Sequence, residues 1–169
     1  MNSEPERLGR SVRGLANWVL DYGDELGVRH TNMGINKLVF FALEAFLLKR
    51  GKLITNAKIE AWEHGPVFRE LYQSFKSFGH GPITTRAKSF SAETNDFEEV
   101  SSNFSDDESD FLKAELGPLM FKNAAELRQL SHLPNGAWHQ VWWYDGHANP
   151  GMEISPSLLL SVKGGMIED

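Results

Sequence analysis

The stretch from residue 58 to residue 79, KIEAWEHGPVFRELYQSFKSFG, places the strongest constraint on the fold. Apolar and polar residues alternate up to Trp62, which is typical of a short extended segment. Gly65 then allows a sharp reversal, and Pro66 suits the first turn of a helix. The apolar residues that follow recur at steps of three and four: Val67, Phe68, Leu71, Tyr72, Phe75 and Phe78. We therefore predict a strand, a turn at Gly65 and a helix that begins near Pro66 and packs one apolar stripe against another surface.

The preceding apolar stretch, NKLVFFALEAFLLKRGK at residues 36–52, predicts a second helix. Its apolar side chains occupy nearly every face, so this helix belongs in the centre of the fold. Lys49 and Arg50 suit its C-terminal end, and Gly51 suits its cap. Glu44 is the unusual residue within it. A carboxylate at the edge of the buried face, or one paired with a base, is a better explanation than a catalytic acid, because buried carboxylates are normally partnered.

The remaining segments complete a mainly helical prediction. We expect helices from residue 12 to about 22, after the capping box that begins at Ser105, after Asn123, and from Ser155 and Pro156 onward. The polar stretch 79–103 predicts a surface excursion with an irregular hairpin. A chain of 169 residues with 41% hydrophobic content fits one domain. The predicted fold is mainly α, a single compact helical domain at 11–169 around a buried central helix, with a small β element and a flexible N-terminus at 1–10.

Charge and cysteine content narrow the functional classes. The net charge of −6 disfavours a protein whose main task is to grip nucleic acid, since phosphate binding needs a basic face. The absence of cysteine excludes disulfides and thiolate metal sites. The N-terminal residues lack the apolar run of a signal peptide, and the longest apolar run is too short for a bilayer core of about 30 Å. These features predict a cytoplasmic protein with no membrane partner.

The sequence offers little for catalysis. His132, His139 and His147 are spaced by seven and eight residues, which matches no compact metal-ligand pattern. Glu63 and His64 are adjacent on an extended segment and would point to opposite faces. Nucleophile-elbow, phosphate-loop and dinucleotide motifs are absent from the sequence. We predict no enzyme, with no catalytic, cofactor-binding or metal residues; a metal-dependent hydrolase using His132 and His139 is the less favoured alternative.

An aromatic cluster near the C-terminus suggests binding instead. Trp138 and Trp142 are four residues apart and share a helical face, whereas Trp143 is turned by about 100°. At least one of the three is therefore expected to be partly exposed. Tryptophan and tyrosine are enriched at protein interfaces, so Trp138, Trp142, Trp143 and Tyr144 are candidate contacts with a protein partner. An irregular backbone that buries all three tryptophans explains the pattern about as well.

Three stretches taken together resemble a known family. INKLVFFALEAFLLKRGK, IEAWEHGPVFRELYQSFKSFG and NAAELRQLSHLPNGAWHQV look like the Panacea domain, the SocA-like antitoxin family that also includes GepA-like phage-associated proteins; the resemblance covers about residues 35–141. Its family-motif residues are Trp62, Gly65, Pro66, Val67, Tyr72, His132 and Trp138. We expect Trp62 and Pro66 to lock the order of the elements, because a turn residue and its aromatic neighbour have an evident packing role.

The resemblance implies a bacterial or phage antitoxin. Such a protein neutralises a cognate protein toxin encoded by the adjacent gene, usually by direct binding, and the family's toxins include small alarmone-synthetase-like and Fic-type enzymes. Relatives that bind operators carry an added helix-turn-helix, and about thirty residues precede the match here, so we expect no autonomous DNA binding. The negative charge suits a partner with a basic face. An adaptor that delivers the toxin to a protease is an alternative.

Overall fold

The computed structural model describes residues 4–134 and 136–168. The helices within these residues are α1 (Val12–Leu26), α2 (Asn32–Arg50), α3 (Arg69–Phe75), α4 (Asp106–Leu116), α5 (Ala124–Ser131), α6 (Ala137–Trp142) and α7 (Pro156–Glu168). Short 3-10 turns η1 (Lys76–Phe78), η2 (Gly117–Leu119) and η3 (Tyr144–Gly146) follow α3, α4 and α6. None of the described helices is both long and apolar enough to cross a lipid bilayer.

The strands are short. They are β1 (Glu6–Arg7), β2 (Lys52–Leu53), β3 (Glu60–Trp62), β4 (Gly65–Val67), β5 (Lys88–Ser91), β6 (Asp96–Glu99) and β7 (Met152–Glu153). They form a parallel pair β1–β2, an antiparallel sheet in the order β4-β3-β7 and an antiparallel hairpin β5–β6. The prediction of a mainly α fold with a small β element is confirmed.

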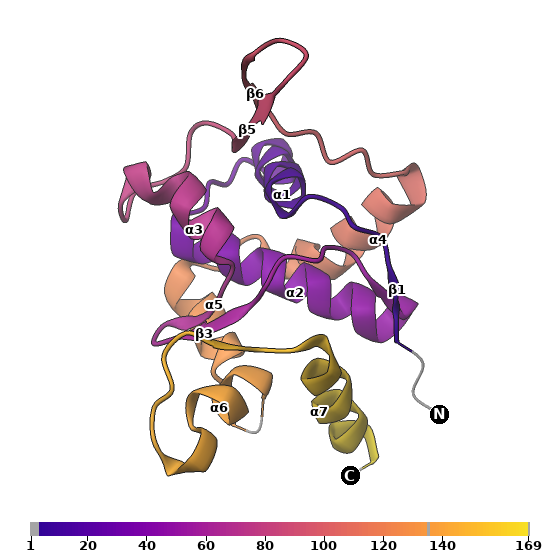
Figure 1. Ribbon diagram of the computed structural model, residues 1–169, viewed down its shortest axis with the longest axis vertical. Helices are drawn as coiled ribbons and strands as arrows, with labels where there is room; N and C mark the ends of the chain where they lie inside the picture. Colours follow the sequence, from indigo (N-terminus) through magenta and orange to yellow (C-terminus); the bar gives the residue numbers. More distant parts are fainter. Residues whose placement is uncertain (1–3, 135, 169) are drawn as a thin grey trace.

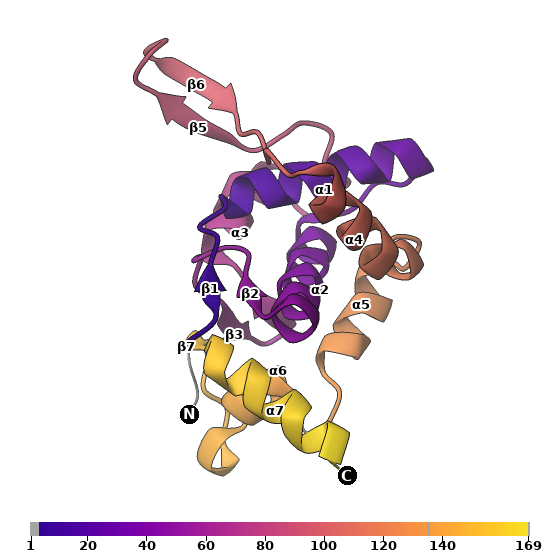
Figure 2. The same ribbon diagram turned by 90° about the vertical axis from the view of Figure 1, so that its right-hand side faces the viewer.

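Helix α2 is the centre of the molecule, as predicted. It packs against α1, α3, α4, α5 and α7 and against strands β2 and β4 (Figures 1 and 2). The Thr31 hydroxyl accepts from the Gly34 amide at 3.2 Å to cap its start. Gly51, with φ of 67°, ends it in the left-handed conformation that glycine adopts most easily. The buried apolar residues of this helix are Ile35, Leu38, Val39, Phe40, Ala42, Leu43, Phe46 and Leu47.

The predicted start of the following helix is wrong. Pro66 lies in strand β4 and pairs with Ala61 across the β3–β4 hairpin, and α3 begins at Arg69. The reversal is made by Glu63 and His64, not by the glycine and proline. Proline is tolerated in a strand where its missing amide is not needed, and β4 is an edge strand of the sheet.

The N-terminal segment departs from the expected flexible tail. Glu6 and Arg7 pair with Lys52 and Leu53, and the Leu8 amide donates to the Leu53 carbonyl at 2.9 Å. Residues 6–8 are therefore joined to the body of the fold through main-chain hydrogen bonds. The helix after them, α1, reaches Leu26, beyond the predicted end near residue 22.

The predicted surface hairpin is present. Strands β5 and β6 project from the body beside α1 (Figures 1 and 2), with Phe90 opposite Phe97. The side chain of Asn17 in α1 holds the base of the hairpin: its Oδ1 accepts from the Ala87 amide at 2.8 Å, and its Nδ2 donates to the carbonyls of Ala87 and Val100. The buried Asn17 side chain thus joins the base of the hairpin to α1, next to the 3.1 Å main-chain hydrogen bond from Val100 to Ala87.

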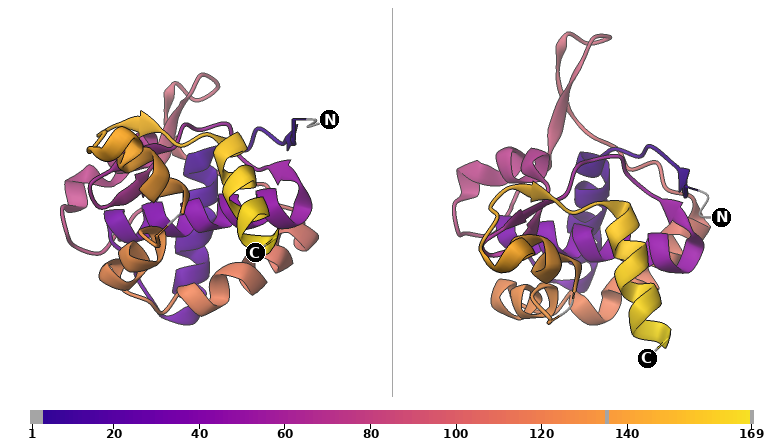
Figure 3. Two further views of the ribbon diagram at one scale, coloured as in Figure 1. Left: turned by 90° about the horizontal axis from the view of Figure 1, so that it is seen from below. Right: turned by 60° about the horizontal axis from the view of Figure 1, so that its bottom comes forward.

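The second half follows the sequence signals closely. Ser105 and Asn123 each form a capping box, with Glu108 and Glu126 respectively, and α4 gives way to a 3-10 turn at Gly117. The sequence Pro134-Asn135-Gly136 also predicts a turn, but Asn135 lies outside the described residues. Helices α6 and α7 cross the same side of α2 (Figure 3). They form the end of the molecule opposite the projecting hairpin (Figure 1).

Candidate functional site

Gly65 places the β3–β4 hairpin directly against the central helix. Its φ of 116° is a conformation that residues with a side chain rarely adopt. A Cβ atom at this position would lie 2.6 Å from Cε of Lys37 and 2.7 Å from Oγ of Ser131. The next residue, Pro66, accepts a 3.1 Å hydrogen bond on its carbonyl oxygen from Nζ of Lys37. Glycine is therefore needed here for its backbone conformation and for the close approach.

Trp62 at the end of β3 is held by polar and aromatic neighbours. Its indole donates to Oε1 of Glu60 at 3.3 Å, and its ring meets the ring of Tyr72 edge to face at 4.9 Å. Arg69 lies over the same indole and also forms a two-point ion pair with Glu60, with both distances 2.9 Å. The hydrogen bonds from Arg69 lower the pKa of Glu60. The two motif aromatics thus pack the hairpin onto α3.

His132 and two tryptophans form a stack behind the hairpin. The rings of His132 and Trp138 lie 3.7 Å apart with an interplanar angle of 18°, and those of Trp138 and Trp142 lie 5.7 Å apart at 14°. Burial lowers the pKa of His132 to about 4, and the positive charges of nearby basic residues act in the same direction. His132 is therefore a neutral stacking partner near pH 7. This shared face confirms the predicted helical spacing of Trp138 and Trp142.

The four candidate contact residues fall into two groups. Trp138 and Trp142 are buried, with 5% and 9% of their surface exposed, whereas Trp143 and Tyr144 are 49% and 67% exposed. The expectation that at least one of the tryptophans is partly exposed is correct. Burial leaves only Trp143 and Tyr144 of this set on the surface for a partner.

The loop that carries the exposed pair is fixed by one asparagine. The side-chain amide of Asn149 donates to the carbonyls of Tyr144 at 2.8 Å and His147 at 2.7 Å, and its main-chain amide donates to the carbonyl of Trp142 at 2.9 Å. Asp145 takes a positive φ of 60° within this loop. The exposed aromatics are thus presented by an ordered turn.

The three histidines nearest the C-terminus, His132, His139 and His147, lie in different parts of the fold. The described residues contain no group of three or more histidine, aspartate or glutamate side chains placed to hold one ion. His132 is used in the stack, and His139 and His147 lie on α6 and in the loop after η3. The described structure thus gives the metal-dependent hydrolase no ligand set.

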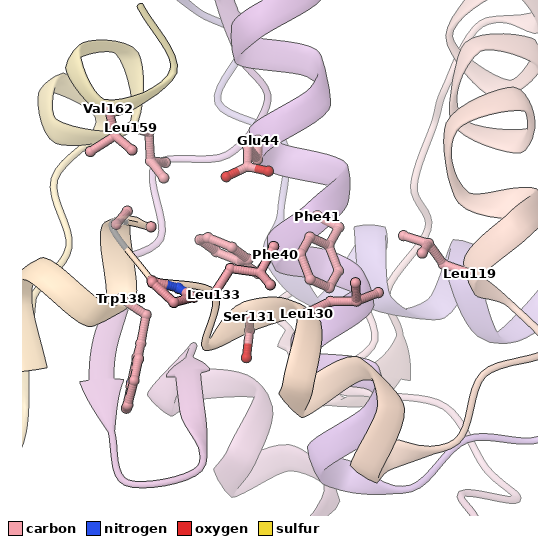
Figure 4. Close-up of a pocket in the computed structure, with 13 residues that line it drawn as sticks. Phe40, Phe41, Glu44, Leu119, Leu130, Ser131, Leu133, Trp138, Leu159 and Val162 are labelled. Carbon is pink, nitrogen blue, oxygen red and sulfur yellow. The ribbon is translucent and has the colours of Figure 1, made fainter. Parts of the chain in front are cut away.

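An apolar cavity of about 160 Å³ lies beside the stack (Figure 4). Helix α2 contributes Phe40, Phe41 and Glu44, and Leu159 of α7 lies across from them. The Glu44 carboxylate is at the edge of this cavity and has a partner in the structure. This position agrees with the expected carboxylate at the edge of a buried face.

Sequence reasoning missed Lys37, which lies in the N-terminal part of α2 and is 1% exposed. Burial lowers the pKa of its ammonium to about 7, and the positive charge of Arg128 acts in the same direction. Its neighbour Asn36 accepts from the Phe68 amide at 2.9 Å and thereby fixes the exit of β4. The sequence does contain a signal for this position: Lys37 lies in a helix whose faces are nearly all apolar, so its side chain has no polar face to occupy.

Comparisons with known proteins agree with this architecture. The family model described as antitoxin SocA-like, Panacea domain, matches residues 35–139, more than half of the chain. Over 76 residues the chain is 36% identical to the antitoxin SocA of Caulobacter vibrioides (strain NA1000 / CB15N). That match covers 45% of this chain and 40% of the relative, so it spans less than half of the relative's length. No solved structure shows a significant match. The matched residues include most of the central helix, the β3–β4 hairpin, and His132 and Trp138 of the stack, and the chain belongs to the SocA-like Panacea-domain family.

Proposed function

We propose that this protein is a non-enzymatic antitoxin that neutralises a cognate protein toxin, encoded by the adjacent gene, by direct binding. The observation that carries the proposal is the family match over residues 35–139, together with the similarity to a protein named as an antitoxin. Small alarmone-synthetase-like or Fic-type enzymes are the toxin classes proposed for it. Binding alone is sufficient for such a role, so no catalytic group is required.

We propose Trp143 and Tyr144 as the main contacts. Both side chains are large, exposed and adjacent, and the hydrogen bonds of Asn149 restrict the loop that presents them. Aromatic anchors on an ordered turn lose little conformational entropy on binding, which favours affinity. The net charge of −6 would increase the rate of encounter with a toxin that carries a basic face.

The projecting β5–β6 hairpin carries a second exposed aromatic surface that is an alternative contact with the toxin. Phe90 and Phe97 face each other on the projecting hairpin at 5.7 Å and are 56% and 63% exposed. Glu98 and Glu99 lie on the same strand as Phe97. The hairpin is therefore an acidic arm with an aromatic pair, and it lies far along the molecule from α6 (Figure 1).

Coexpression tests the antitoxin role. The adjacent gene should arrest bacterial growth when expressed alone, and this chain should restore growth and co-purify with its product. The double variant Trp143→Ala/Tyr144→Ala should lose rescue, while Phe90→Ala/Phe97→Ala should retain it. Phe121→Ala, at a 66% exposed position outside both surfaces, is the matched control. Absence of both arrest and rescue for every neighbouring gene would contradict the antitoxin function.

The same strains separate occlusion from delivery to a protease. With simple occlusion, the toxin persists in an inactive complex, and its half-life after a block of translation is unchanged or longer. With an adaptor, the toxin's half-life becomes shorter when this chain is present. We expect persistence, since a contact made by a few aromatic anchors can by itself cover a functional surface.

A further inference from the structure

A basic cavity lies between the central helix and α5. Its volume is about 800 Å³, it is open to solvent, and His64 of the β3–β4 turn and His80 after η1 also line it. The ionisable side chains that line it are Lys37, His64, His80, Glu126, Arg128 and His132. Five of these six are basic, in a chain whose net charge is −6. Lys37 and Arg128 supply the positive charge of the cavity, whereas His132 is neutral near pH 7.

Lys37 lies in the wall of the cavity without an acidic partner. Its ammonium donates to the Pro66 carbonyl, and the described residues supply no carboxylate within ion-pair distance of it. Buried ammonium groups are normally paired with a carboxylate, because removal from water is costly. One carbonyl oxygen leaves two of its three donors for another acceptor.

The other basic groups converge on the same place from separate elements. Burial lowers the pKa of His132 most, and the charges of Arg128, Lys37, His64 and His139 act in the same direction. Nε2 of His132 is buried and has no hydrogen-bond partner among the described residues. The guanidinium of Arg128 forms no ion pair within the part of the chain that the structure describes. The positive charges of Lys37 and Arg128 repel one another, and an anion placed between them would relieve that repulsion.

Glu126 does not supply the missing negative charge. Among the described residues that line the cavity, Glu126 is the single acidic one. Its Oε1 accepts from the Asn123 amide at 3.1 Å in the α5 capping box. The carboxylate is thus used at the start of α5, where it stabilises the helix end. An anion bound in the cavity would give the protonated form of Lys37 the counter-charge that Glu126 does not provide.

We propose that the basic cavity binds the phosphate group of a small organic phosphate, with Lys37 and Arg128 as its charged donors. A phosphate monoester carries nearly two negative charges and several acceptor oxygens, which suits donors that approach from different elements. Arginine can bind two of the oxygens at once, and lysine acts as a compact point charge. The volume lies in the range of small-molecule sites and exceeds what phosphate alone needs.

A neighbouring cavity offers space for the organic part. It measures about 360 Å³, shares Met33, His64 and His80 with the basic cavity, and is lined by Trp62 and Tyr72. An apolar, aromatic wall next to a charged subsite is the usual composition of a pocket for a small ligand. The proposed site uses neither Trp143 nor Tyr144, and it does not depend on the proposed antitoxin function.

Titration calorimetry on the purified full-length chain tests the site, with AMP, ribose 5-phosphate, inorganic phosphate and acetate as probes. AMP or ribose 5-phosphate should bind more tightly than phosphate, and acetate should bind much more weakly. Lys37→Met and Arg128→Gln should each reduce the affinity by about tenfold or more. Arg29→Gln, the same change at an exposed arginine outside the cavity, should have no effect.

Proton uptake provides an independent readout. Anion binding favours the charged form of Lys37, so binding near pH 7.5 should take up protons. The number of protons taken up is obtained by comparing the binding enthalpies in buffers of different ionisation enthalpy. Lys37→Met should abolish much of this uptake while leaving a folded protein, because it removes a buried charge. Arg128 is exposed, so Arg128→Gln tests the site without disturbing the core.

Several outcomes would overturn the proposal. One is the absence of binding by either organic phosphate at concentrations of about 10 mM, where even millimolar affinity is measurable. Another is binding that both variants leave unchanged, which would place the anion elsewhere on the surface. Acetate that binds as tightly as the phosphates would contradict the assignment of a phosphate group.

Discussion

Nε1 of Trp138 donates a 2.7 Å hydrogen bond to the main-chain carbonyl of Trp62, which lies 76 residues earlier in the chain. Trp62 ends β3 just before the hairpin turn, and Trp138 lies in α6 and stacks on His132. The bond therefore ties the C-terminal part of the family region to the hairpin that rests on α2. Two tryptophans that are far apart in the sequence stabilise one junction.

Truncation of Trp138 should be costly. Trp138→Ala removes a buried aromatic side chain, its stack with His132 and its bond to Trp62, and we expect a loss of about 3–5 kcal/mol in the free energy of unfolding. Trp143→Ala deletes the same side chain at a half-exposed position and should cost less than about 1 kcal/mol. Urea unfolding followed by circular dichroism measures both. Equal losses for the two variants would show that the junction does not stabilise the fold.

Gly65 should tolerate no side chain. Gly65→Ala places a Cβ atom 2.6 Å from Cε of Lys37 in a backbone conformation with φ of 116°, so the hairpin or the lysine has to move. Gly51→Ala is the matched control, because Gly51 also has a positive φ but a Cβ atom added there would have nothing within 4 Å. We expect about 1 kcal/mol for the control and clearly more, about 2–4 kcal/mol, for Gly65→Ala.

Thermal and urea unfolding of the two glycine variants provide the comparison. Similar stability losses would mean that the close approach of the hairpin to Lys37 and Ser131 is easily relaxed. A larger loss for Gly65→Ala would support an approach that the surrounding core prevents from relaxing.

Periodicity was enough to predict the central helix and most of the fold around it. Apolar residues on every face placed α2 in the core, and the capping residues Ser105 and Asn123 located the starts of α4 and α5. Such signals are local, because a cap or a stripe depends on residues within one or two turns.

The errors arose where distant contacts decide the structure. Pro66 is a favourable first residue of a helix, but pairing with Ala61 and the bond from Lys37 keep it extended. Strand β7 joins β3 through Met152, and two paired residues are too few to produce an alternating pattern. The buried position of Lys37 could not be predicted either, since it depends on a hairpin that the sequence suggested only in part.

Lys37 should make stability depend on pH. In the unfolded chain it holds its proton up to its ordinary pKa of 10.5, whereas in the folded protein it loses the proton near pH 7. Between these values the unfolded chain binds more protons, so this residue makes stability rise with pH. Below about pH 7 both states are protonated, and the full cost of the buried charge is present.

Lys37→Met should therefore stabilise the protein at neutral pH. The gain should be on the order of a few kcal/mol, reduced by the lost bond to the Pro66 carbonyl. The difference between variant and wild type should shrink as the pH rises toward about 9.5, since the wild-type lysine then carries less charge in the folded state. Urea unfolding at several pH values measures it, with Lys49→Met, at an exposed lysine of the same helix, as control. A difference that does not change with pH would show that Lys37 titrates normally.

Asn149 should control binding through the loop that it orders. Asn149→Ala removes the side-chain bonds to the carbonyls of Tyr144 and His147, which leaves the loop free to sample other conformations before binding. If Trp143 and Tyr144 are the toxin contacts, ordering their loop then reduces the free energy of binding. We therefore expect about tenfold weaker binding of the adjacent gene's product. Asn149→Asp keeps the acceptor but not the donor, so it should behave like the alanine variant. Both should unfold at nearly the wild-type urea concentration, because the side chain lies at the surface of the fold. Surface plasmon resonance measures the affinity. Weaker binding with unchanged stability supports a contact loop that is ordered before binding. Unchanged affinity would assign recognition to another face, and the Phe90–Phe97 pair would be the next surface to test.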